Sequence, residues 1–150
     1  HRACQVGCYV IGTVCPDSSP YAIEATPYLD SGSMCCMINP RGTTWRNLQE
    51  NQHVLVKLTL SSPCFSSWAG VSCVGTGIFD SDPQSIREGF TALGSVLGVD
   101  YSAAGEKYAR TPERSPLLRM TFTGSSGRCS NMPGQPIDVR VFGSGGEVIQ

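Results

Sequence analysis

The strictest alternation of apolar and polar residues in this chain lies at residues 53–60. One set of alternate positions is apolar throughout and the other is mixed: Val54, Val56, Leu58 and Leu60 against His53, Leu55, Lys57 and Thr59. Successive side chains of a β-strand point to opposite faces, so this pattern predicts a strand with one face on a core. Its second face, with Leu55 among polar residues, is of the kind that a partner covers.

Other segments carry a similar extended pattern and stop at turn-forming residues. One extended segment ends at a turn at residues 16–20, and the next ends at residues 30–32. The turn at residues 30–32 is typical of a β-hairpin. The predicted strands, about six to seven in all, are residues 8–15, 21–29, 34–38, 53–60, 71–80, 117–123 and 137–143. A Gly/Ser/Pro-rich connection, residues 124–136, separates the last two.

A short helix is predicted at residues 44–52, where the chain reads TWRNLQENQ. It follows a loop that runs from Asn39 to Gly42, and either Thr43 or Thr44 is available to cap its free amides.

A second helix is predicted to begin with Asp82 as its N-cap and Pro83 at its first position. Its apolar residues recur at spacings of four, three and four: Ile86, Phe90, Leu93 and Leu97. They form one stripe that can cover an open end of a barrel. A polar connector with one possible helical turn follows at residues 99–116.

The order of these elements resembles a known architecture. From residue 12 to residue 60 the chain reads strand, turn, strand, tight turn, strand, short helix, strand, which looks like the front half of the split β-barrel of the pyridoxamine-phosphate-oxidase-like flavoproteins. Within that superfamily, the run NLQEN at residues 47–51, followed at once by an alternating strand, resembles the CREG family of secreted glycoproteins. The resemblance implies a mainly β split barrel with short helices that forms a homodimer through barrel faces.

Length and charge narrow the possibilities. At 150 residues the chain is long enough to bury a core of its own, so we expect one domain over residues 1–150. The net charge of -1, with 11 scattered basic residues, gives no electrostatic footprint for nucleic acid. No stretch approaches the roughly 20 apolar residues that a transmembrane helix requires.

The first residues raise the question of processing. The chain opens with His1, and the resemblance implies a helix before the first strand, of which HRACQVG looks like only the end. We therefore expect a processed or incomplete N-terminus, from which a targeting sequence has been removed.

Eight cysteines are a high, even count that favours an oxidising compartment, so we expect a secreted or lumenal protein. Cys64 and Cys73 bracket a short loop between two strands, and CREG-type proteins also have cysteines flanking this connection; we expect these two to form a disulfide.

Adjacent Cys35 and Cys36 on a strand must point to opposite faces, and one should face the core. His1, Cys4 and Cys8 could approach one face of a helix, but no fourth ligand is evident, so no metal site is predicted.

The resemblance also places a candidate cofactor site. In flavin-binding members the FMN phosphate lies near the start of the helix that corresponds to residues 44–52, where free amides favour an anion. In this chain the corresponding residues are Asn39, Arg41, Thr43, Thr44 and Arg46. The serine, arginine, lysine triplet of the oxidases is absent, because Gly42, Thr43 and Thr44 occupy those positions. We interpret the site as vestigial, and CREG is described as having the fold without the flavin function.

No catalytic residues are predicted. The chain has two histidines, His1 and His53, and nothing in the sequence places a nucleophile beside either. Two hypotheses remain: a non-catalytic binding module or subunit of an assembly, without a cofactor, and a small FMN-dependent oxidoreductase or a related binder of haem or deazaflavin. We favour the first.

Overall fold

The structure is a computed structural model that describes residues 6–30, 32–62 and 66–130. Its strands form one sheet of seven in the order β2-β1-β5-β6-β7-β4-β3, and every adjacent pair is antiparallel. The strands are β1 Val6–Val14, β2 Pro20–Glu24, β3 Tyr28–Asp30, β4 Ser33–Met37, β5 His53–Ser61, β6 Trp68–Phe79 and β7 Leu117–Ser130. The helices are α1 Thr43–Glu50, α2 Pro83–Leu97 and α3 Ser102–Ala109, with a 3-10 turn at Pro112–Arg114.

The mainly β class is therefore confirmed. Several boundaries differ from expectation. The extended stretch at residues 21–29 is divided into β2 and β3, and β7 continues through the glycine- and serine-rich residues 124–130 because it stays paired with β6. Of the expected end of an N-terminal helix, Val6 and Gly7 are strand, and residues 1–5 lie outside the described residues. The polar connector holds a full helix, α3. The strand predicted at residues 137–143 lies outside the described residues.

The sheet curls around its main apolar core, as the alternation in β5 predicts. Val54 and Val56 are buried on its inner face, where they lie in a cluster with Ile11 of β1 and Leu118 of β7. Leu48 of α1 belongs to the same cluster, so this short helix packs on the core with its apolar side. Leu55, between the two buried valines, stays 46% exposed on the opposite face.

The start of α1 differs from the prediction. Its N-cap is Gly42, and no side chain accepts a hydrogen bond from the free amides at this end. Thr43 and Thr44 are both inside the helix, and Thr44 is buried. A buried hydrogen bond ties α1 to β1: Asn47 Nδ2 donates to Thr13 Oγ1 at 3.0 Å.

Helix α2 begins as predicted. Pro83 is its first residue, and the Asp82 carboxylate accepts a hydrogen bond from the Ser85 amide at 2.7 Å. Ile86, Phe90 and Leu93 are buried, but Leu97 is 46% exposed. The stripe ends early because Gly98, at a φ of 68°, turns the chain out of the helix immediately after Leu97.

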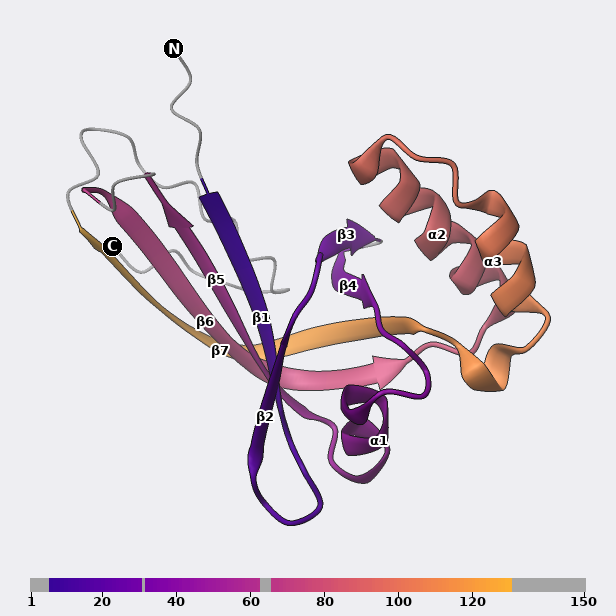
Figure 1. Cartoon of the computed structure of the whole chain (residues 1–150), viewed down its shortest axis with the longest axis horizontal. Coiled ribbons are helices and arrows are strands. Elements are labelled where there is room, and N and C mark those ends of the chain that lie inside the picture. The colour runs from indigo at the N-terminus through magenta and orange to yellow at the C-terminus, as the bar shows by residue number, and fades with distance from the viewer. Residues whose placement is uncertain (1–5, 31, 63–65, 131–150) are drawn as a thin grey trace.

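Helices α2 and α3 lie side by side at one end of the molecule, next to β3 and β4 (Figure 1). Phe90 of α2 stacks on Tyr108 of α3, with ring centroids 5.7 Å apart. Leu93 packs in a second buried cluster with Tyr28, Cys35 and Leu117. The helices thus cover this end of the sheet, and the long strands extend away from them.

Cys35 and Cys36 point to opposite faces of β4, as expected, yet both are fully buried. Cys36 lies in the main core, whereas Cys35 lies in the cluster beneath α2. Cys73 is also fully buried in the main core and forms no disulfide within the described residues. Cys64 lies outside the described residues, so the expected bond between Cys64 and Cys73 stays a prediction.

Gly75 provides a test of the β6–β7 pairing. A Cβ added there would collide with the carbonyl oxygen of Thr121 and come within 2.8 Å of the Phe122 Cα, both backbone atoms that cannot move away cheaply. We predict that Gly75→Ala lowers the free energy of unfolding by about 3 kcal/mol in a urea titration.

Gly124→Ala is the matched control, because its Cβ would meet only the Val74 Cγ2 at 3.4 Å, an ordinary contact. It should change the free energy of unfolding by less than about 1 kcal/mol. Equal effects of the two substitutions would show that the close approach at Gly75 does not constrain the pairing.

Candidate functional site

The loop before α1 is held in a tight turn by its own polar groups. Asn39 Oδ1 accepts a hydrogen bond from the Arg41 amide at 3.0 Å, and the Gly42 amide donates to the Asn39 carbonyl at 2.9 Å. The Arg41 side chain is exposed at the tip of this turn. Asn39 therefore fixes the backbone of this turn. The Arg41 side chain makes the positive charge of the loop available to an anion at the start of α1.

The predicted phosphate residues are only partly brought together. Arg46 Nη2 donates to Thr43 Oγ1 at 3.2 Å, so these two side chains occupy one turn of α1. Thr44 is 3% exposed and points away from solvent. No acidic residue lies in the first turn of α1, so the helix start can attract an anion. Of the five predicted residues, Arg41, Thr43 and Arg46 are accessible at this helix start, Asn39 is exposed but holds the preceding turn, and Thr44 is buried.

A larger hollow lies on the face of β1, β5 and β6 that points away from the core, which we call the outer face. Its volume is about 830 Å³. Two of its lining residues, Leu55 and Val74, lie opposite each other in the β5–β6 register and are 46% and 50% exposed. Gly12 lies opposite Leu55 on β1, and Gly124 lies opposite Val74 on β7. Two exposed apolar side chains are thus flanked on both sides by glycines.

The lining of this hollow carries no Lys, Arg, Asp or Glu side chain. Its residues are Gly12, Thr13, Val14, Pro20, Tyr21, Ala22, His53, Val54, Leu55, Val74, Gly75, Thr76 and Thr123. His53, at the start of β5, is the one side chain among them with a basic nitrogen. One feature of the sequence indicated this surface, namely the apolar Leu55 among polar residues on the second face of the strand. It could not show that Val74 and Gly12 are next to Leu55.

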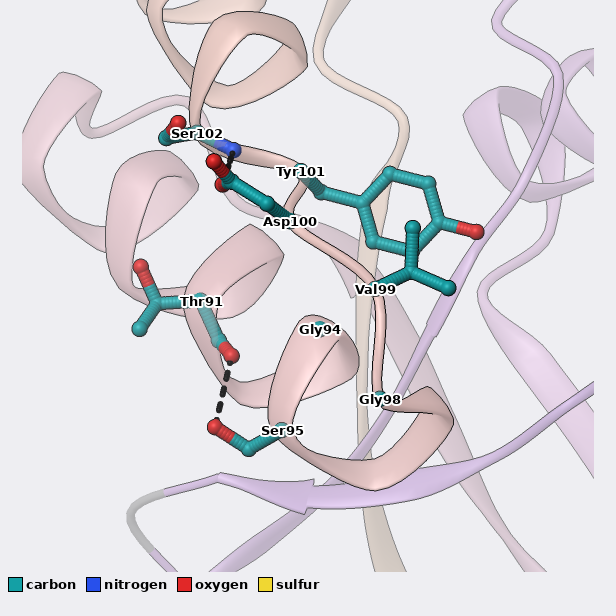
Figure 2. A pocket seen from close by; sticks show the side chains of 8 residues that line it. All are labelled: Thr91, Gly94, Ser95, Gly98, Val99, Asp100, Tyr101 and Ser102. Carbon is teal, nitrogen blue, oxygen red and sulfur yellow. Dashed lines mark hydrogen bonds between the residues drawn. The ribbon is translucent and has the colours of Figure 1, made fainter.

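A smaller hollow of about 410 Å³ lies between the end of α2 and the start of α3 (Figure 2). Its polar groups are used locally. Ser95 Oγ donates to the Thr91 carbonyl at 3.1 Å, and Asp100 Oδ1 accepts from the Ser102 amide at 2.9 Å. No histidine or cysteine lines it, so it offers no pair of nucleophile and base.

A charged cluster lies where β7 meets the helical end of the sheet. Arg119 bridges two carboxylates: its Nη2 is 2.8 Å from Asp30 Oδ2, and its Nε is 2.7 Å from Asp80 Oδ2. Its Nη1 also donates to Cys35 Sγ at 3.4 Å. Burial by itself raises the pKa of Asp80, but hydrogen bonds from the Asp82 amide and from Arg119 lower it overall. The cluster is a structural tie between the sheet and the start of α2.

The buried thiols are unsuited to nucleophilic chemistry. Burial raises the pKa of Cys35 to about 11, although Arg119 opposes this shift. Burial also raises the pKa of Cys36 to about 12. Both are protonated at neutral pH, whereas the thiolate is the reactive form. Within the described part of the chain, no group of three His, Cys, Asp or Glu side chains could hold a metal ion.

Among the described residues, no helix combines the length and apolarity that crossing a membrane would require.

Comparison with known proteins finds likeness at the level of structure. No protein-family model matches the chain, and no curated protein matches it. Conserved hypothetical protein Rv2991 of Mycobacterium tuberculosis is similar with a TM-score of 0.68 and 15% identity, over 86% of this chain and 81% of that one. The haem storage protein HutZ of Vibrio cholerae is similar with a TM-score of 0.59 and 11% identity, over 79% of this chain and 84% of that one.

A third similar structure is a putative 5-nitroimidazole antibiotic resistance protein of Bacteroides thetaiotaomicron. Its TM-score is 0.59 at 14% identity, over 81% of this chain and 76% of that one. Identities this low show a shared fold alone. The chain shares its fold with these structures, and that fold is a mainly β split barrel, as the order of its elements predicted.

The charged cluster predicts how stability depends on pH. Because the pKa of Asp80 is lower in the folded protein, its stabilising effect is present above about pH 4 and is lost as the pH falls through the folded pKa. Asp80→Asn should lower the free energy of unfolding at pH 7 by about 1–2 kcal/mol and flatten its decline below pH 4.

Urea titrations between pH 2 and pH 7 measure both effects. Glu113→Gln is the control, since Glu113 is exposed and forms no ion pair with any described residue. An undiminished acid slope in Asp80→Asn would contradict the role assigned to the Asp80–Arg119 pair.

Proposed function

We propose that this chain is a non-catalytic split-barrel binding module that acts as a subunit of a protein assembly. The observation that carries this proposal is the outer face, where Leu55 and Val74 are about half exposed above an uncharged hollow. Adjacent apolar side chains left in water are costly, and such patches commonly mark interaction sites. A protein partner would remove both from solvent.

The helix start supports a binding role over a flavin-dependent one. FMN phosphate carries close to two negative charges, and a helix terminus alone contributes on the order of 0.3–1 kcal/mol toward an exposed anion. Tight binding needs several charge-assisted hydrogen bonds. Here Arg46 already bonds to Thr43, Thr44 is buried, and Arg41 is the remaining cation of the predicted set. The likeness of NLQEN at residues 47–51 to the CREG family agrees with this role, as does a secreted or lumenal location.

The second candidate is an FMN-dependent oxidoreductase or a related haem or deazaflavin binder. Arg41 and Arg46 at the start of α1 favour it, since both are exposed near free helix amides. Similar structures include the haem storage protein HutZ, a FAD-binding protein of Mesorhizobium loti and an F420 reductase. This candidate requires a bound chromophore.

Two measurements separate the candidates. The purified protein should show no visible absorbance band, because bound flavin or haem absorbs visible light and a bare barrel does not. Calorimetric titration with FMN should give a Kd weaker than about 1 µM, since no clamp of basic side chains surrounds the helix start.

Arg41→Ala and Arg110→Ala are the matched variants, because both arginines are exposed and Arg110 follows α3. A submicromolar FMN affinity that collapses in Arg41→Ala and survives in Arg110→Ala would overturn the non-catalytic proposal and favour the oxidoreductase.

A further inference from the structure

We propose that a patch of the sheet beside the large hollow binds a phosphate group. The patch is formed by two cations, Lys57 of β5 and Arg128 of β7, which the strand register brings toward one glycine, Gly70 of β6. None of these three residues lines the hollow. The site goes beyond the proposed function, since it does not use Leu55 or Val74.

The register places both cations on the same face of the sheet. In one row of paired residues, Ser72 lies between Lys57 and Ser126. In the next row of that face, Arg128 lies opposite Gly70. Paired residues point to the same side, and so do residues two positions apart along a strand. Two cations and two serine hydroxyls therefore surround a position that has no side chain.

The Lys57 ammonium group lies over Gly70. Its Nζ donates a hydrogen bond to Ser72 Oγ at 3.3 Å and is 3.1 Å from the point where a Cβ of residue 70 would lie. The Cβ atoms of directly opposite residues are about 5 Å apart, so the Arg128 side chain starts close to that same point. The missing side chain of Gly70 thus leaves room for one ligand between the two cations.

No acidic side chain of the neighbouring strands neutralises these charges. The described strands β5, β6 and β7 contain no Asp or Glu. Glu24 of β2 is separated from Lys57 by the whole of β1, which is roughly 10 Å between their strands. Neither Lys57 nor Arg128 forms an ion pair with any described residue. Because like charges repel, an anion between these two cations stabilises both.

The donors of the patch suit a tetrahedral oxyanion. Arginine offers a planar fork of N–H groups and lysine a point charge, and phosphate is bound by both. Ser126 and the two cations are exposed, so a ligand can reach them. A phosphate group has three or more oxygens that can accept from both cations and a hydroxyl together, whereas a carboxylate has two. Inorganic phosphate and a phosphate monoester share this chemistry.

The test is a titration of the full chain with inorganic phosphate at pH 7 and constant ionic strength, followed through amide resonances in nuclear magnetic resonance spectra. We expect the amide signals of Gly70, Ser72 and Arg128 to shift and saturate, with a Kd on the order of 1 mM. A parallel titration with glycerol phosphate distinguishes the two sources. An equal Kd would support recognition of the phosphate group itself, and a tighter one would support recognition of an esterified phosphate.

Three variants test the geometry. Lys57→Gln and Arg128→Gln should each raise the Kd by about tenfold, because each removes one charge-assisted contact. Gly70→Ala keeps both charges, but its Cβ displaces the flexible end of Lys57. It should raise the Kd by about threefold, because hydrogen bonds weaken as their geometry is distorted.

Arg110→Gln is the matched control, because Arg110 is an exposed arginine at the end of α3. It should leave the Kd unchanged. The dispersion of the amide signals checks that each variant is folded.

Three results would overturn the site. The first is the absence of saturable shifts at Gly70, Ser72 and Arg128. The second is binding that survives Lys57→Gln and shifts Gly42 at the start of α1. The third is an equal loss in Arg110→Gln, which would show general charge attraction. The proposed function is decided separately, by the absorbance spectrum and by the dependence of FMN binding on Arg41.

Discussion

The antiparallel pairing of β6 with β7 is the interaction on which the rest of this structure depends. β7 joins the two parts of the sheet, since it pairs with β6 on one side and with β4 on the other. The pairing is interrupted between Val74 and Gly75, where the register shifts and Thr123 is the extra residue. Such a bulge bends a strand and increases its twist. Both strands curve strongly in Figure 1, and Gly75 permits the close approach of the Thr121 backbone at this point.

This pairing gives the two ends of the sheet different surroundings. At the end next to the helices, Leu117 packs in the buried cluster beneath α2. Arg119 forms ion pairs with Asp30 and Asp80 at the same end. Beyond the bulge, none of the three helices of the described residues covers the outer face, and Leu55 and Val74 are about half exposed. The exposure of Leu55 and Val74 is therefore a consequence of where the helices stop. The same barrel can carry a role without a cofactor, because fold does not determine function.

Sequence patterns predicted what depends on local chemistry. The alternation in β5 and the Asp82 cap of α2 follow from neighbouring residues, and both are confirmed. Features set by distant contacts were missed. The glycine- and serine-rich residues 124–130 remain strand because β6 supplies their hydrogen bonds. Thr44 faces the interior and not a ligand, because packing of α1 on the core decides its direction. The outer face required the register between strands, which a single sequence does not contain.

The central claim is that the outer face of β1, β5 and β6 is the surface through which this protein associates. Methyl resonances in a nuclear magnetic resonance dilution series test it most directly, because each probe reports on its own surroundings. We expect the methyl signals of Leu55 and Val74 to shift or broaden as protein concentration rises, while those of Val96 and Val99 stay unchanged. Concentration-independent signals from Leu55 and Val74, with changes confined to Val96 and Val99, would contradict the account.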